Sequence, residues 1–163
     1  MCGITGFLDT RRELNTAELT AAVTRMSDAI HHRGPDDSGE WVDAETGLAF
    51  GFRRLAIVDL TPTGHQPMIS ASGRYVMVFN GEIYNYAEMR NELIASGVKF
   101  RGTSDSEVMV EAMDAWGIVP SIKRFNGQFA FALWDRKERV LHLVRDRVGV
   151  KPMYFGWFVK TLL

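Results

Sequence analysis

The stretch QFAFALWDRKERVLHLV, Gln128–Val144, shows the pattern on which the fold prediction depends. Gln128–Trp134 is an apolar and aromatic run that predicts one strand, and Val140–Val144 predicts a second. The charged run that begins at Asp135 lies between them and predicts a hairpin loop. Strands joined in this way pair antiparallel, so we expect an antiparallel sheet here.

The rest of the chain adds strands and helices on both sides of this hairpin. Strands are predicted at Gly3–Leu8, Leu48–Val58, Arg74–Phe79 and Met153–Val159, and helices at Ala87–Ser96 and Ser104–Trp116. A further helix is predicted to begin at Asn15 or Thr16, with Glu18 returning a capping bond to Asn15. Its apolar stripe is Leu19, Val23, Met26 and Ile30. Hairpin-like strands with helices between them favour an α+β layered fold over a doubly wound one.

The composition is that of one globular domain. The chain has 163 residues, 46% of them hydrophobic, and 19 basic residues against 20 acidic ones leave a net charge of −1. Such a balance provides no basic surface for nucleic acid. No apolar run approaches the roughly 20 residues that a membrane helix needs, and no secretory signal opens the chain. We therefore expect a soluble, cytoplasmic domain, and its strand-like last residues indicate an excerpt from a longer chain.

The single cysteine, Cys2, allows two interpretations. It cannot form an internal disulfide or a zinc site alone. If Met1 is removed, the thiol and a free α-amine share the first residue, and the amine can accept a proton near neutral pH. That pair supplies a nucleophile and its base in one residue. From position alone, the commoner role of a free cysteine as a small buried hydrophobe is favoured.

Asn80-Gly81 follows an apolar run and also allows two interpretations. The pair is the strongest short-range signal for a tight hairpin turn, which would make Glu82–Tyr86 the partner strand. The alternative is an oxyanion hole, built from the asparagine side-chain N–H and the glycine backbone N–H. Spacing alone favours the turn.

Arg53 and Arg54 lie in an otherwise apolar strand. Because successive side chains point to opposite faces, only one of them can share a face with Ala56 and Val58. Such an arginine either binds a carboxylate ligand through its planar guanidinium group or lies in water on an edge strand. The two interpretations are equally supported.

The run Ser104–Glu107 has the capping-box pattern, with Ser104 as N-cap and Glu107 reaching back. Asp105 in that first turn is favoured by the helix dipole whatever its function. The four histidines show no metal-ligand spacing, so no metal site is predicted, and no phosphate-binding loop indicates ATP binding.

Taken together, several segments resemble the N-terminal glutaminase domain of glutamine-hydrolysing asparagine synthetases. The start, MCGITG, resembles class II glutamine amidotransferases in general. The segments that narrow the match are His32–Asp36 (HRGPD), Arg54–Asp59 (RLAIVD), His65–Pro67 (HQP), Asn80–Asn85 (NGEIYN), Ser104–Val108 (SDSEV) and Arg145–Pro152 (RDRVGVKP). They follow the family's order and cover nearly all of residues 1–163, which we therefore expect to form one glutaminase domain.

The resemblance implies a fold and a set of site residues. The fold is that of N-terminal-nucleophile hydrolases, an α+β four-layer αββα sandwich with two antiparallel sheets between helices. Cys2 resembles the nucleophile, with its own α-amine as base, while Asn80 and Gly81 match the oxyanion hole. The residues that match the glutamine-binding pocket are Arg54 for the α-carboxylate, Leu55, Ala56, Ile57 and Val58 for its backbone lining, and Glu82 and Asp105 for the α-ammonium group. Arg33 is expected to support the nucleophile.

The resemblance also implies the reaction and the partners. L-Glutamine would be hydrolysed to L-glutamate and ammonia through a thioester, and the ammonia passed to a C-terminal synthetase domain. That domain, which would need ATP and Mg²⁺, is absent from these residues, whereas the glutaminase domain itself needs no cofactor. A homodimer is expected, and no nucleic acid or membrane partner. Two alternatives remain: a catalytically idle glutamine-binding or scaffolding domain, and an amidotransferase for an acceptor other than aspartate.

Overall fold

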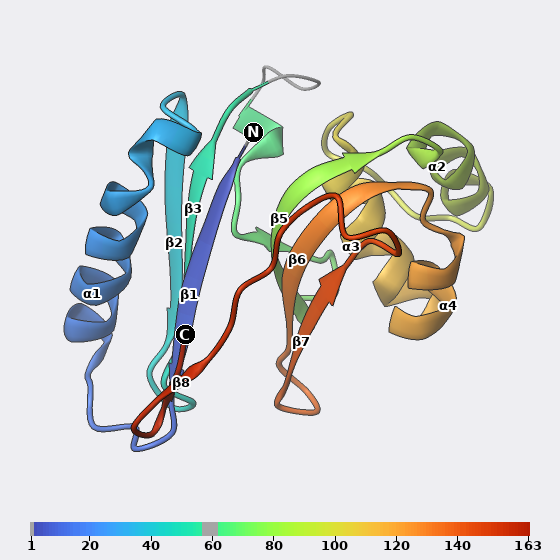
Figure 1. Cartoon of the computed structure of the whole chain (residues 1–163). Helices are drawn as coiled ribbons and strands as arrows, with labels where there is room; N and C mark the ends of the chain where they lie inside the picture. The colour runs from blue at the N-terminus through green and yellow to red at the C-terminus, as the bar shows by residue number, and fades with distance from the viewer. Residues whose placement is uncertain (1, 57–61) are drawn as a thin grey trace. The chain divides into compact units, whose positions relative to one another are not determined.

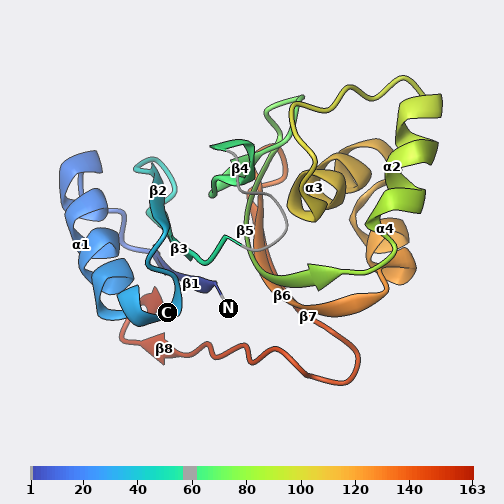
Figure 2. The same cartoon turned by 90° about the horizontal axis from the view of Figure 1, so that it is seen from above.

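A computed structural model describes residues 2–56 and 62–163 of the chain (Figures 1 and 2). These residues form two compact units, each with a sheet and a core of its own. The first unit contains the described part of Met1–Ala56 together with His65–Pro67 and Met153–Leu163. The second contains the described part of Ile57–Gly64 together with Met68–Pro152.

The first unit is a five-stranded antiparallel sheet with one helix. Its strands are β1 (Gly3–Asp9), β2 (Asp37–Asp43), β3 (Leu48–Arg54), β8 (Trp157–Phe158) and β9 (Thr161–Leu162), in the order β2-β3-β1-β9-β8. Helix α1 (Thr16–Ala29) lies along one face of β1, β2 and β3 (Figure 1). Strand β3 is therefore an interior strand, hydrogen-bonded on both sides.

Helix α1 begins as the sequence predicts. The Asn15 side chain accepts a hydrogen bond from the Glu18 N–H at 3.1 Å, and the Glu18 carboxylate accepts one from the Asn15 N–H at 2.8 Å. Such a capping box satisfies two of the four N–H groups left over at a helix start. Leu19 and Val23 of the predicted stripe are fully buried in a small core that α1 forms with β1 and β3.

The second unit is a four-stranded antiparallel sheet with three helices. Its strands are β4 (Met68–Ile69), β5 (Tyr75–Ile83), β6 (Gly127–Asp135) and β7 (Val140–Arg145), in the order β4-β5-β6-β7, and its helices are α2 (Tyr86–Ala95), α3 (Asp105–Trp116) and α4 (Ile118–Arg124). The predicted hairpin is confirmed, because β6 and β7 pair antiparallel from Ala130 and Arg145 to Asp135 and Val140. Seen from above, the helices lie on one side of this sheet (Figure 2). The main core lies between them and β5 and β6.

The turn predicted at Asn80-Gly81 is wrong. Strand β5 continues through both residues to Ile83, with Asn80 opposite Ala130 and Gly81 opposite Phe129 on β6. A Cβ atom on Gly81 would collide with the Gln128 carbonyl oxygen and lie 2.6 Å from the Phe129 Cα. Glycine is thus required here by the close approach of a neighbouring strand, and not by a turn conformation.

Strands β2 and β4 and helix α4 were not anticipated from the sequence. Strand β2 carries few β-branched residues, and its conformation comes from pairing with all seven residues of β3. Helix α4 follows α3 directly, after Gly117 at φ 88°. Pro120 does not prevent it, because a first-turn residue needs no intrahelical N–H partner.

The strand predicted at Met153–Val159 is largely wrong. Only Trp157–Phe158 is extended and paired, and Val159 has φ 56°, which turns the chain into β9. The aromatic and apolar residues that favoured a long strand are mostly exposed. Aromatic composition by itself therefore overestimated the strand.

The predicted α+β fold class is confirmed: the described residues contain two antiparallel sheets and four α-helices. Each unit places its helices on a face of its own sheet. In the described part of the chain, no helix combines the length and the apolarity that crossing a bilayer requires.

Candidate active-site residues in the two units

The Cys2 thiol lies beside the backbone of Leu55, in the first unit. Its sulfur is 3.4 Å from the Leu55 nitrogen and 3.6 Å from the Leu55 carbonyl oxygen. The residue is only partly buried, so it is not the small core hydrophobe that its position alone favoured. The thiol is therefore held by polar backbone groups, in a residue that keeps part of its surface exposed.

Arg33 contacts the backbone of Cys2. It belongs to the 3-10 turn His31–Arg33 that follows α1, and its Nη2 donates to the Cys2 carbonyl oxygen at 3.4 Å. The turn thus brings one cationic side chain to the residue that carries the thiol.

The two arginines at the end of β3 point to opposite faces, as the strand period requires. Arg53 faces α1: its Nε donates to the Ser27 carbonyl oxygen at 3.1 Å, and its guanidinium group pairs with Asp28. Arg54 is buried, with 8% of its surface exposed. The edge-strand interpretation is wrong for Arg54, because β3 is an interior strand and the side chain does not lie in water.

The HRGPD segment packs directly against the end of β3. A Cβ atom on Gly34 would collide with the backbone of Arg53 and Arg54. Two residues on, the Asp36 N–H donates to the Arg54 carbonyl oxygen at 3.0 Å, and the Asp36 carboxylate accepts the Ala56 N–H at 2.9 Å. Asp36 was not among the predicted site residues. The signal that could have indicated a role for Asp36 is its position, as an acid that follows Gly34 and Pro35 and directly precedes a strand.

The HQP segment contacts the first three residues of β2. His65 Nδ1 lies 2.8 Å from the Asp37 carboxylate, and Gln66 is buried. A Cβ atom on Gly39 would collide with the Gln66 carbonyl oxygen. This segment therefore shapes the strand that follows Asp36. The predicted pocket residues Ile57 and Val58 lie outside the described residues, whereas Leu55 and Ala56 are described.

The second unit carries Asn80 and Gly81 in mid-strand. Asn80 is buried, with 5% of its surface exposed, and Gly81 is partly buried. Both are held by the β5–β6 ladder. A rigid strand is a better support for paired N–H donors than a hairpin tip would be, because its backbone is fixed on both sides.

Two carboxylates, Glu82 and Asp105, lie close enough in the second unit to interact electrostatically. Asp105 is buried at the start of α3, where its two oxygens accept the Ile83 N–H at 3.0 Å and the Ser106 N–H at 2.8 Å. Burial raises the pKa of Asp105, and the negative charge of Glu82 raises it further, against the effect of the two N–H donors. Glu82 itself is exposed. Such a pair attracts a cation.

The predicted capping box at α3 forms only by half. The Ser104 hydroxyl accepts the Glu107 N–H at 3.3 Å, as expected. The Glu107 carboxylate does not return to Ser104 and instead accepts the N–H groups of Arg101 and Gly102, each at 2.8 Å. Glu107 therefore holds the segment before the helix, which leaves Asp105 to connect the helix with β5.

The RDRVGVKP segment of the second unit is organised by the buried Asp146. Its carboxylate accepts four backbone N–H groups, from Phe129, Val148, Val150 and Lys151, at 2.9–3.2 Å. Burial alone would raise the pKa of Asp146, but the backbone donors outweigh it and hold the pKa at about 2. The loop after β7 is thus fixed to β6.

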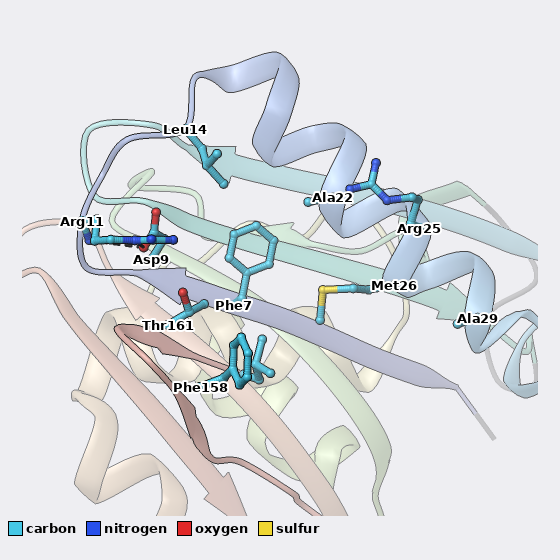
Figure 3. A pocket seen from close by; sticks show the side chains of 11 residues that line it. Phe7, Asp9, Arg11, Leu14, Ala22, Arg25, Met26, Ala29, Phe158 and Thr161 are labelled. Atoms are coloured by element: carbon cyan, nitrogen blue, oxygen red, sulfur yellow. Dashed lines mark hydrogen bonds and ion pairs between the residues drawn. The ribbon is translucent and has the colours of Figure 1, made fainter.

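A cavity of about 720 Å³ in the first unit is lined by none of the predicted site residues. It lies between α1 and the strands, with Phe7 from β1, Met26 from α1 and Phe158 from β8 on its walls (Figure 3). Within residues 2–56 and 62–163, no group of three or more histidine, cysteine or acidic side chains is arranged to hold a metal ion.

Comparison with known sequences gives one family and a consistent set of relatives. Residues 1–163 match the family described as "Glutamine amidotransferase domain". Asparagine synthetase (glutamine-hydrolyzing) 3 of Bacillus subtilis is 42% identical over 157 residues, which is 95% of this chain and 25% of that protein. Amidase chry2 of Gibberella zeae is 35% identical over 170 residues, covering 100% of this chain and 25% of that protein. The chain thus spans about a quarter of the length of these relatives.

Among solved structures, the chain resembles glutamine phosphoribosylpyrophosphate amidotransferase from B. subtilis, determined with ADP and GMP. The TM-score is 0.62 at 17% sequence identity, over 98% of this chain and 34% of that one. At this identity the likeness concerns the fold alone.

Proposed function

The chain belongs to the glutamine amidotransferase domain family, and on this premise we propose that it hydrolyses L-glutamine to L-glutamate and ammonia through a thioester on Cys2. The observation that carries the proposal is the position of the thiol: the only cysteine of the chain is partly exposed, and its sulfur is held by the Leu55 backbone. A structural cysteine would be packed among apolar side chains instead.

In the first unit, the nucleophile and the carboxylate clamp come from neighbouring strands. Cys2 immediately precedes β1, and Arg54 ends β3, which pairs with β1. The guanidinium group of Arg54 would bind the α-carboxylate of glutamine in a bidentate manner. Arg33, which donates to the Cys2 carbonyl oxygen, would hold the first residue in place.

In the second unit, the residues proposed for the oxyanion hole and Glu82 of the proposed ammonium site follow one another along β5, and Asp105 joins them from the start of α3. The side-chain N–H of Asn80 and the backbone N–H of Gly81 would stabilise the developing oxyanion, and each such donor is worth about 3 kcal/mol in the transition state. The carboxylates of Glu82 and Asp105 would receive the α-ammonium group. Their mutual repulsion supports this role, because a bound cation relieves it.

The chemical steps balance without a cofactor. The α-amine of Cys2, free once Met1 is removed, takes the thiol proton, and the sulfur forms a bond to the side-chain carbonyl carbon of glutamine. The C–N bond then breaks, and the leaving nitrogen takes the proton from the amine and departs as ammonia. Water, losing a proton to the same amine, attacks the thioester, so that glutamate leaves and the thiol is restored.

In the longer protein, the ammonia would serve an ATP- and Mg²⁺-dependent synthetase domain. The asparagine synthetases among the relatives suggest aspartate as the acceptor. The amidase among them keeps a different acceptor open. Alone, the 163 residues would release free ammonia, and a cytoplasmic location and a homodimer are part of the same proposal.

The proposal is tested by incubating the purified chain with L-glutamine and measuring glutamate and ammonia. Intact-mass measurement first establishes that Met1 has been removed, because with Met1 retained the Cys2 nitrogen is part of a peptide bond and cannot serve as the base. We expect equimolar glutamate and ammonia from the processed chain and none from Cys2→Ala.

The same two proteins distinguish the idle glutamine-binding domain. If calorimetry shows that both the processed chain and Cys2→Ala bind glutamine, and the processed chain does not turn it over, the function is glutamine binding and not hydrolysis. A processed chain that neither binds nor hydrolyses glutamine would refute both functions.

A further inference from the structure

The Cys2 sulfur lies just before the start of β1 and contacts the residue that follows the end of β3. Strand β1 pairs with β3 with Gly3 opposite Arg53. On this register Leu55 lies two residues past Arg53, beyond the first residue of β1. The Cys2 sulfur lies there, beside both the N–H and the carbonyl oxygen of Leu55.

The two contacts suit the two protonation states of the thiol. A thiol can donate its hydrogen to the Leu55 carbonyl oxygen, 3.6 Å away. A thiolate has no hydrogen to donate and can only accept, so it would take the Leu55 N–H, 3.4 Å away. A hydrogen bond to a charged acceptor is roughly twice as strong as one between neutral groups.

Asp36 holds the same piece of backbone from its other edge. On an extended strand, the N–H and C=O of one residue point to one side, and those of its two neighbours point to the other. The neighbours of Leu55 are both bound by Asp36, whose N–H donates to the Arg54 carbonyl oxygen and whose carboxylate accepts the Ala56 N–H. Residue 55 is thus fixed between the sulfur and Asp36.

We propose that the Leu55 N–H stabilises the Cys2 thiolate during glutamine hydrolysis and that Asp36 is the positioning residue that holds this N–H toward the sulfur. The inference rests on the proposed function for its catalytic meaning. Its structural content concerns only the first unit and can be measured without glutamine.

The test uses the rate at which iodoacetamide alkylates Cys2 at pH 7, together with kcat and KM for glutamine. Because the chain has one cysteine, the label reports on a single site. Asp36→Ala removes the acceptor for the Ala56 N–H, and Asp36→Ser shortens the side chain by one atom so that its oxygen no longer reaches that N–H. Asp36→Asn keeps an oxygen at the original position. Glu40→Ala, which removes an exposed acid from strand β2 four residues after Asp36, is the matched control.

We expect Asp36→Ala and Asp36→Ser to slow alkylation by about three- to tenfold, the value of one hydrogen bond, and to lower kcat by a similar factor with little change in KM. Asp36→Asn and Glu40→Ala should behave like the parent chain. Circular dichroism identifies any variant that does not fold. If Asp36→Ala does not fold, the rates of Asp36→Ser decide the outcome.

Faster alkylation of both Asp36→Ala and Asp36→Ser would overturn the proposal, because a merely loosened strand end exposes the thiol and accelerates the reaction. Alkylation at the parent rate would overturn it as well, and so would an Asp36→Asn variant as slow as Asp36→Ala. Absence of glutamine turnover in the processed parent chain would instead refute the proposed function, while the alkylation rates would still decide the role of Asp36.

Discussion

Replacing Asp105 by asparagine removes one negative charge from the proposed ammonium site while preserving the size of the side chain. Asp105 is buried, and its oxygens accept the Ile83 and Ser106 N–H groups, so its position is fixed before any ligand arrives. The negative charge of Glu82 lies close enough to raise the pKa of Asp105, in addition to the effect of burial. A fixed, buried carboxylate with a second carboxylate close by should therefore bind an ammonium group strongly.

The expected size of the effect follows from the hydrogen bond that is weakened. A hydrogen bond to a charged group contributes about 1.5–3 kcal/mol, which corresponds to a factor of roughly 10 to 150 in an equilibrium constant. We expect Asp105→Asn to raise KM for glutamine by at least about tenfold and to change kcat much less, because the ammonium group is distant along the substrate from the reacting amide. Initial rates of glutamate formation over a range of glutamine concentrations give both constants.

Glu107→Gln is the matched control, since Glu107 is also buried in the first turn of α3 but contacts Arg101 and Gly102 instead of β5. It should lower the unfolding temperature without a specific rise in KM. A folded Asp105→Asn variant whose KM stays within twofold of the parent value would refute the assignment of Asp105 to the ammonium group. An equal rise in Glu107→Gln would show that the helix start, and not the charge, controls binding.

Three further outcomes are expected. Gly81→Ala should lower the unfolding free energy by about 2–3 kcal/mol in urea denaturation, because the added methyl collides with the Gln128 carbonyl, whereas Gly156→Ala, with open space around it, should be neutral. Asp146→Ala should lower the unfolding free energy by about 3 kcal/mol or more near pH 7, because it leaves four N–H groups without their acceptor. Since the pKa of Asp146 in the folded chain, about 2, lies below the ordinary 3.8, the stability difference between parent and variant should shrink as pH falls from 3.8 toward 2. An unchanged stability difference over that pH range would contradict the reasoning. In the parent chain, KM for glutamine should begin to rise on acidification at a pH above 3.8, because the raised pKa of Asp105 makes it lose its charge earlier than an ordinary aspartate; a KM independent of pH down to 3.8 would argue against that.

Two features that depend on a few neighbouring residues were predicted correctly. The capping box of α1 and the β6–β7 hairpin follow from side chains a few positions apart, so the sequence contains all of the information. The family could also be recognised, because short motifs in a set order are a property of the sequence alone, and the match over residues 1–163 confirms it.

The errors at the strands have a common cause in pairing between distant strands. Asn80-Gly81 has the local signal of a turn, yet β6 extends β5 through it, and the closeness of that strand is what requires glycine. Strand β2 has a weak local signal and exists because β3 pairs with it. Conversely, the aromatic run before Val159 has a strong local signal but few partners for its backbone.

Through its resemblance to the glutaminase domains, the sequence thus identified a thiol, an arginine, an amide and two acids as the candidates for glutamine chemistry. Their surroundings depended on folding: Cys2 meets Leu55 across 53 positions of sequence, and Asp36 reaches Ala56 across 20. Hydrogen bonds of this kind are made only after the strands have paired, because the register brings the groups within reach. Chemical identity is carried by single residues, whereas the environment of each group is a property of the folded sheet.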